Sequence, residues 1–289
     1  MHHIFVETDA LDVERKHLTV TGDNFHHMVR VLRMKEGDEF SVSVRGEEGK
    51  EYRFGIENIT EEKACCILRF VKEQGSELPA RVILLQGLPK ADKMEMIIQK
   101  TVELGISEIV PVSMKRSIVK LDDKKAASRV ERWNKIAESA ASQSKRGIIP
   151  QVTRVMGLRE ALAYVKDAAL KLIPYEMADI KAMDKTRNLI RSVSHLQANE
   201  ERPLEGPSLE CSSGVCNGRR AWKNKTDTEA VNQPIPVIAY IIGPEGGFAE
   251  EEVKTAIDSG FQQVTLGGRI LRTETAGMVV MSWLMYELE

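Results

Sequence analysis

The feature that most constrains the fold is an alternation of short apolar runs with amphipathic segments after residue 79. The apolar runs have the length of buried strands, and they cover 81–86, 109–112, 170–174, 237–242 and 263–266. Between two of them, residues 124–145 place Trp133, Ala137 and Ala140 along one side of a predicted helix. Strands that alternate with helices predict an α/β unit, in which helices cover a parallel sheet.

The chain before residue 73 has a different pattern, rich in short strands. Residues 39–44 alternate polar and apolar side chains, as a half-buried strand does, and 52–56 repeat the pattern. Turn residues such as Gly37 and Asp38 separate these runs, which predicts a small β-barrel. A polar break at 73–79 divides the chain, so we expect two units, 1–72 and 79–289.

A long polar stretch at about 184–234 interrupts the second unit. From Gln197 it is rich in Glu, Asn, Ser, Gly, Pro and Lys, which predicts a loop. For the earlier part, 187–196, a helix is an open alternative. Cys211 and Cys216 lie in this stretch without a His or Cys pair at zinc-finger spacing, so we expect no metal site. The adjacent Cys65 and Cys66 are expected to be strand residues rather than a redox pair.

Composition narrows the class of protein without identifying a partner. Apolar residues make up 42% and charged residues 29%, which is ordinary for a globular chain. No apolar run is long enough for a membrane helix, and the N-terminus lacks the features of a signal peptide, so we expect a cytoplasmic protein. The net charge of −2 does not indicate nucleic-acid binding, although a local basic face remains compatible with it.

The first candidate site is the glycine-rich turn 242–248, Ile-Gly-Pro-Glu-Gly-Gly-Phe. It follows the apolar strand 237–242 and precedes a predicted helix at 250–259. Glycines let a backbone approach a ligand closely, and parallel sheets bind ligands at the carboxyl ends of their strands. The turn is neither a P-loop nor a dinucleotide fingerprint, and on spacing alone a tight turn without a ligand is equally compatible.

A second turn of the same kind spans 266–276. It links the strand 263–266 to a predicted final helix at 274–288, with Thr273 in position to cap that helix. On pattern alone, Arg272 is equally a solvated arginine and Glu274 equally an acid that favours a helix start. If the two turns follow neighbouring strands, they form one pocket.

Taken together, G-P-E-G-G-F and L-G-x-R-I-L-R-x-E-T-A resemble the RsmE-type small-subunit rRNA uracil-N3 methyltransferases of the SPOUT superfamily. Further matching segments run from the front of the chain to Pro150, at 27–33, 37–38, Lys90, Lys93, 99–105, 116–120 and 143–150. The resemblance covers nearly everything except about 184–234. Ser142 departs from the family's pattern, in which an acidic residue is expected, and the role of that position is therefore in doubt here.

The resemblance implies a fold and a cofactor. The fold is a PUA-like N-terminal β-barrel followed by a SPOUT-type parallel sheet with a trefoil knot, and related enzymes form homodimers through the last helix. The cofactor is S-adenosylmethionine, held by the loops that begin at Pro174, 242 and 266. The residues implied in its binding are Pro174, Ile242, Gly243, Glu245, Gly246, Gly247, Leu266, Gly267, Ile270, Leu271, Thr275 and Ala276.

The resemblance also implies the reaction, which is methylation of N3 of a uridine in the decoding region of 16S rRNA in the small ribosomal subunit. Arg272 would stabilise negative charge on the base, and Glu274 is a weaker candidate for the general base. No metal takes part. The residues implied in RNA binding are His27, Arg30, Arg33, Lys90, Lys93, Lys100, Arg116 and Arg146. For His27, a buried core position is an equally open alternative.

Three alternatives remain at this stage. The first is another SPOUT methyltransferase that acts on transfer RNA, which the match of the N-terminal segment disfavours. The second is a non-catalytic RNA-binding or assembly protein, which the intact glycine-bearing turns disfavour. The third is a nucleotide-dependent oxidoreductase, which the missing dinucleotide fingerprint makes the weakest of the three.

Overall fold

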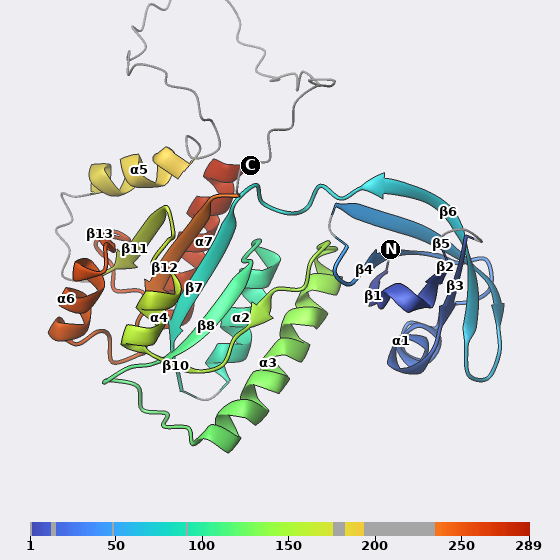
Figure 1. Cartoon of the computed structure of the whole chain (residues 1–289), viewed down its shortest axis with the longest axis horizontal. Coiled ribbons are helices and arrows are strands. Elements are labelled where there is room, and N and C mark those ends of the chain that lie inside the picture. The colour runs from blue at the N-terminus through green and yellow to red at the C-terminus, as the bar shows by residue number, and fades with distance from the viewer. Residues whose placement is uncertain (1, 13–15, 48, 91, 176–182, 194–234) are drawn as a thin grey trace, which may run out of the picture.

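The computed structural model describes residues 2–12, 16–47, 49–90, 92–175, 183–193 and 235–289. Two sheets organise this part of the chain, one built from the N-terminal strands and one from the strands after residue 80 (Figure 1). The remaining residues, with Cys211 and Cys216 among them, lie outside the described part. The predicted domain boundaries and the trefoil knot stay predictions.

The second sheet has seven strands, and all its recorded pairings are parallel, as predicted. Its order is β10-β8-β7-β12-β11-β13, with β9 paired to β8. The strands are β7 (Arg81–Gly87), β8 (Glu108–Ser113), β9 (Gln151–Val152), β10 (Met156–Gly157), β11 (Leu170–Pro174), β12 (Val237–Ile242) and β13 (Gln262–Val264). The strand β12 therefore lies between β7 and β11, and the turn that follows it begins in the middle of the sheet.

Helices cover both faces of this sheet because its strand residues alternate between two apolar cores. Val82 and Leu84 of β7 face one core, and Ile83 and Leu85 face the other. The first core contains residues of α2 (Lys93–Glu103), α3 (Asp123–Gln143), α5 (Met183–Arg191) and α7 (Thr273–Leu288). The second core contains residues of α4 (Leu158–Tyr164) and α6 (Glu250–Asp258).

The predicted cap of the last helix differs from what the sequence suggested. Thr273 is the first residue of α7 rather than its cap, because its hydroxyl is bonded elsewhere in the fold. The long helix α3 is capped at its N-terminus by the side chain of Asp122, whose carboxylate accepts a hydrogen bond from the Lys125 amide at 2.8 Å.

The helix that the sequence left open for 187–196 is present as α5, which starts earlier, at Met183, and ends at Arg191. Helix α5 buries Thr186 and Ile190, and the Thr186 hydroxyl accepts a hydrogen bond from the Thr265 amide at 3.1 Å. The loop predicted from Gln197 to residue 234 lies outside the described residues.

The N-terminal sheet has six strands in the order β1-β4-β5-β6-β3-β2. They are β1 (His3–Val6), β2 (Leu11–Asp12), β3 (His17–Val20), β4 (Glu39–Val44), β5 (Lys50–Ile59) and β6 (Ala64–Glu73). After β3 the chain forms a short helix, α1 (Gly22–His26), which is continued by the π-helical turn η2 (His27–Val31). The sequence did not predict this helical segment. Inward side chains of the strands, among them Phe40 and Phe54, form a separate core together with Met28 of η2. A further short turn, η1 (Thr8–Ala10), precedes β2.

Cys65 and Cys66 lie on β6, as expected for strand residues, and both are free thiols. Burial raises the pKa of the Cys66 thiol to about 12, which keeps it protonated and unreactive. Among the described residues no group of His, Cys, Asp or Glu is placed to bind a metal. Within the same part of the chain, no helix has the length and apolar character needed to cross a bilayer.

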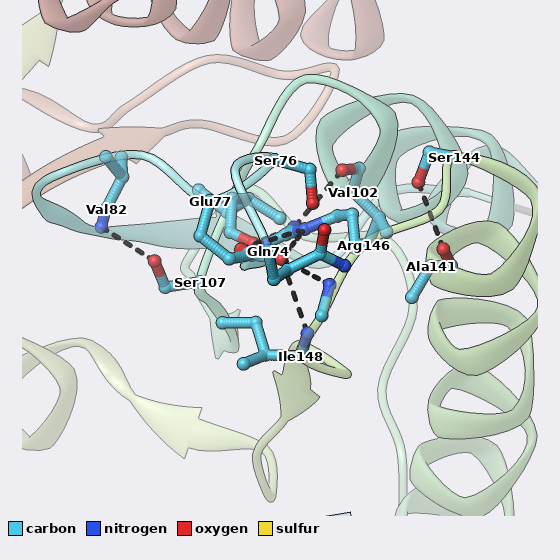
Figure 2. Close-up of polar contacts among 12 residues, drawn as sticks. Gln74, Ser76, Glu77, Val82, Val102, Ser107, Ala141, Ser144, Arg146 and Ile148 are labelled. Carbon is cyan, nitrogen blue, oxygen red and sulfur yellow. Dashed lines mark hydrogen bonds and ion pairs between the residues drawn. The ribbon is translucent and has the colours of Figure 1, made fainter. Parts of the chain in front are cut away.

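The connection between the two sheets is held by the buried side chain of Arg146. Only 2% of Arg146 is exposed. Its guanidinium pairs with Glu77 in the connecting segment and donates to the carbonyl oxygens of Val102 and Ile106 (Figure 2). Gln74 and Ser76 side chains add hydrogen bonds to the Lys145 carbonyl oxygen, both at 3.2 Å. Arg146 is therefore enclosed and paired within the chain, whereas its predicted role in RNA binding stays a prediction.

A second buried polar group, His3, lies on β1 of the N-terminal sheet. His3 is 6% exposed, and its Nδ1 lies 2.9 Å from the Ser41 hydroxyl. Burial lowers the pKa of His3 from 6.5 to about 4, although the charge of Glu51 opposes this shift. The folded protein therefore holds His3 neutral over a pH range in which an unfolded chain would protonate it.

We predict that Arg146→Met lowers the free energy of unfolding by about 3 to 5 kcal/mol, because it removes the cation paired with Glu77 and the donor to two carbonyl oxygens. The matched control is Arg154→Met, which breaks the exposed pair with Glu160 and should cost far less, because water screens both charges. Urea unfolding of both variants measures the difference. Equal losses in the two variants would show that the Arg146 cluster is no more important than a surface pair.

We predict that acid destabilises the fold partly through His3. Because the unfolded state binds more protons between pH 6.5 and about 4, the stability due to neutral His3 is complete above pH 6.5 and is lost as the pH falls to about 4. This loss amounts to roughly 3 kcal/mol. The measurement is the free energy of unfolding against pH for the wild type, His3→Gln and the exposed-site control His17→Gln. Parallel curves for the wild type and His3→Gln would contradict the prediction.

Candidate functional site

A cavity of about 500 Å³ opens at the carboxyl ends of β11, β12 and β13. Its walls come from the end of β11, the 242–248 turn, the 265–272 turn and the start of α7. The lining residues are Lys93, Pro174, Tyr175, Ile242, Gly243, Pro244, Glu245, Gly247, Phe248, Thr265, Leu266, Gly267, Gly268, Arg269, Ile270, Leu271, Arg272, Thr273 and Ala276. Its size and its place in the sheet are typical of a small-molecule site.

The two glycine-bearing turns meet through the hydroxyl of Thr273. This hydroxyl donates a hydrogen bond to the Gly243 carbonyl oxygen at 2.6 Å and accepts one from Gln86 Nε2 at 2.9 Å. Gln86 is completely buried at the end of β7. The contact joins β7, the turn after β12 and the start of α7, and it confirms the expectation that the two turns enclose one pocket.

Glycine is required at two positions by different physical constraints. Gly267 has a φ of +101°, a conformation that residues with a side chain rarely adopt. At Gly246 an added Cβ would lie 2.9 Å from the Cβ of Arg116, because the 114–118 segment crosses the turn. The Arg116 guanidinium donates to the Gly246 carbonyl oxygen at 3.1 Å and holds the turn against this segment.

A cluster of three charged side chains lies on one wall of the cavity. We call Lys93, Glu245 and Glu274 the charge cluster. The Lys93 ammonium is 3.2 Å from Glu245 Oε1 and 3.3 Å from Glu274 Oε2. Its members come from α2, the turn after β12 and the first turn of α7, so they connect three separate elements.

Hydrogen bonds keep Glu245 and Lys93 in their charged forms. Burial alone would raise the pKa of Glu245, but hydrogen bonds from the Lys90 amide and the Lys93 ammonium hold it below its ordinary value. The hydrogen bond to Glu245 raises the pKa of Lys93, with a further contribution from Glu274, against the opposing effect of burial. At neutral pH Lys93 is therefore a cation and Glu245 an anion.

Most of the residues predicted to bind a cofactor line the cavity. Those that do are Pro174, Ile242, Gly243, Glu245, Gly247, Leu266, Gly267, Ile270, Leu271 and Ala276. Gly246 and Thr275 do not line it, and their role in cofactor binding stays a prediction. Ile270 lines the cavity, but 83% of this residue is exposed.

Several lining residues were absent from the prediction. They are Tyr175, Pro244, Phe248, Thr265, Gly268, Arg269 and Thr273. Each is adjacent to or inside a predicted segment, so extending those segments by one residue would have included them. Thr273 was predicted only as a helix cap, so its hydrogen bonds to Gly243 and Gln86 were not foreseen.

The two predicted catalytic residues occupy different environments. Arg272 is exposed and lines the cavity. The side chain of Glu274 is only 12% exposed, pairs with Lys93 and is not among the lining residues. The Glu274 carboxylate therefore belongs to the charge cluster, and its role as a general base stays a prediction.

The residues predicted to bind RNA fall into three groups. His27, Arg30 and Arg33 are exposed on or next to η2, which excludes the buried alternative for His27. Lys90 and Arg116 are exposed beside the cavity turns. Lys93 is held in the charge cluster, Lys100 pairs with Glu103, and Arg146 is buried in the connection between the sheets.

Comparison with protein families matches both parts of the chain. Residues 76–199 and 215–285 match a family described as an RNA methyltransferase domain. Residues 20–69 match a family described as an RNA methyltransferase PUA domain. The parallel sheet, the cavity at its carboxyl edge and these matches define an RNA methyltransferase of two units.

The chain belongs to the ribosomal RNA small subunit methyltransferase E family. It is 32% identical to the member from Bacillus subtilis over 100% of this chain and 98% of that protein. It is 30% identical to the member from Synechocystis over 94% of this chain and 74% of that protein.

Solved structures of similar proteins contain S-adenosylmethionine. A ribosomal RNA small subunit methyltransferase E from Neisseria gonorrhoeae, bound to S-adenosylmethionine, matches with a TM-score of 0.70 and 27% identity, over 99% of this chain and 97% of that one. A putative methyltransferase from Legionella pneumophila, also with bound S-adenosylmethionine, matches with a TM-score of 0.72 and 27% identity, over 98% and 96% of the two chains.

We predict that Thr273→Val lowers the free energy of unfolding by about 1 to 3 kcal/mol. The substitution removes the buried hydroxyl to which both the Gly243 carbonyl and the Gln86 amide are hydrogen-bonded. The matched control is Thr255→Val on α6, whose exposed hydroxyl bonds only the Glu251 carbonyl oxygen of its own helix. Thermal unfolding compares the two variants. The role given to Thr273 fails if both variants melt together with the wild type.

Proposed function

We propose that this chain transfers a methyl group from S-adenosylmethionine to N3 of a uridine in the decoding region of 16S rRNA in the small ribosomal subunit. The proposal includes the SPOUT-type trefoil knot and a cytoplasmic homodimer. The observation that carries it is the cavity closed by two glycine-bearing turns, which Thr273 joins at the carboxyl edge of the sheet.

The residues present fit this cofactor. The cavity of about 500 Å³ is within the range of sites for ligands of this size. Backbone groups of the 242–247 and 266–272 segments can bond an adenine edge, and glycine permits the approach. The apolar side chains of Ile242, Leu266 and Leu271 supply surface for the adenosyl group.

When bound, S-adenosylmethionine supplies the methyl group as an electrophile. The protein has to hold the acceptor nitrogen in line with it, and this alignment removes much of the entropic barrier. Uracil N3 is nucleophilic as its anion, so its proton passes to water before the bond to carbon forms, and the negative charge of that anion lies partly on the base carbonyls. Arg272, exposed at the cavity wall, is the cation placed to stabilise that charge.

The exposed basic residues support a path for the RNA. His27, Arg30 and Arg33 lie on the N-terminal unit, whereas Lys90 and Arg116 lie beside the cavity. Cations of this kind bind phosphates without reading sequence, and such binding weakens steeply with salt. A uridine within a helix must also leave its stack to enter a cavity.

Helix α7 supports the proposed dimer, but only with part of its apolar surface. Met281 and Leu284 are fully buried in the core of the chain itself. Met278, Val279 and Trp283 are half-buried, and they leave apolar surface for a second copy. Sedimentation of the purified chain measures this state.

The test of the proposed reaction is mass spectrometry of nucleosides from 16S rRNA of cells that lack the protein. We expect one 3-methyluridine to disappear from the decoding region and to return when purified protein and S-adenosylmethionine are added to small subunits. An unchanged 16S rRNA with a methyl group lost from transfer RNA would favour the alternative substrate. Binding of the cofactor without any change in RNA methylation would contradict the proposed reaction.

We predict that Arg272→Ala lowers turnover roughly a hundredfold, because a cation is lost where charge develops in the transition state. Affinity for S-adenosylmethionine should stay within about fivefold of wild type. The matched control is Arg159→Ala, on the exposed surface of α4. Turnover on small subunits and calorimetry with the cofactor measure the two effects. An Arg272→Ala variant at the wild-type rate would remove this residue from the mechanism.

A further inference from the structure

We propose that the charge cluster of Lys93, Glu245 and Glu274 makes the cavity discriminate the cationic methyl donor from its neutral thioether product. This inference rests on the proposed cofactor, and it assigns the three residues a role in ligand selection. One ammonium and two carboxylates leave a net charge of −1 on this wall. That charge stabilises a positive ligand more than a ligand without the additional charge.

The position of the cluster makes its charge effective. Lys93 and Glu245 line the cavity, and Glu274 is bonded to Lys93 directly behind it. The side chains of Lys93, Glu245 and Glu274 are 33%, 23% and 12% exposed, so water screens them less than it screens surface charges. The Lys90 amide donates to both oxygens of Glu245, which fixes that carboxylate in place.

The other charges that line the cavity are cations. Arg269 and Arg272 line it, and both are exposed to solvent. Arg116 is exposed too, and its guanidinium is bonded to the Gly246 carbonyl oxygen. Because these cations are present in every cluster variant, the effect of the cluster is measured as the change in ligand selection when one of its own charges is removed.

Methyl transfer changes the charge of the ligand, and the cluster can discriminate between donor and product by that charge. The bond between sulfur and the methyl carbon breaks, its electron pair stays on sulfur, and the sulfonium becomes a neutral thioether. The ligand therefore loses one positive charge, while the rest of its structure is unchanged except for the missing methyl group. A wall with net negative charge then binds the product less favourably relative to the donor, which assists product release.

The experiment is calorimetric titration with S-adenosylmethionine and with S-adenosylhomocysteine, at pH 8 and low salt, and the readout is the ratio of the two affinities. Glu274→Gln removes one negative charge and should shift the ratio against the donor, by roughly threefold to tenfold. Lys93→Met removes the positive charge and should shift the ratio toward the donor by a similar factor. Lys93→Arg keeps the charge and should retain the wild-type ratio.

Controls on the same helix separate local charge from net charge. Glu103→Gln and Lys100→Met remove the same charges from a pair outside this cavity, and they should leave the ratio within about twofold of wild type. General damage to the site would weaken both ligands in both cluster variants and would leave the ratio unchanged. An unchanged ratio, or shifts in the same direction for Glu274→Gln and Lys93→Met, would overturn the inference. Failure of the wild-type protein to bind either ligand would instead count against the proposed function.

Discussion

The site depends on one buried hydroxyl, that of Thr273. It donates to the Gly243 carbonyl and accepts from Gln86, so a single side chain holds the end of β7, the turn after β12 and the start of α7 together. Both partners are enclosed, and a carbonyl or amide left unpaired there would cost more than the hydrogen bond itself contributes. The cavity therefore owes its shape to a polar contact inside an otherwise apolar sheet.

Around this contact, charges of both signs meet at the cavity. Lys93 and Glu245 line it together with Arg269 and Arg272, and Glu274 is paired with Lys93. A net charge of −2 for the whole chain conceals this arrangement, because it averages over all of the charged side chains. Local electrostatics, rather than the total, is what a nucleic acid or a charged cofactor meets.

The sequence predicted the parts of the structure that depend on local pattern. The parallel strands, the two glycine-bearing turns and most of the cavity lining follow from apolar runs and glycine positions. The ion pairs of Arg146 and Glu274 were not predicted, because their partners, Glu77 and Lys93, are far away in the chain and only the fold brings them close. A motif match assigns a residue type to a position, but it does not show which charge that residue will meet.

The Arg146 cluster has a consequence for how a large substrate is handled. By tying the connecting segment to the 145–148 loop, it limits rotation of the N-terminal sheet against the parallel sheet. If the proposed RNA contacts both the π-helical turn and the mouth of the cavity, a fixed connection between the two sheets would limit which nucleotide reaches the cavity.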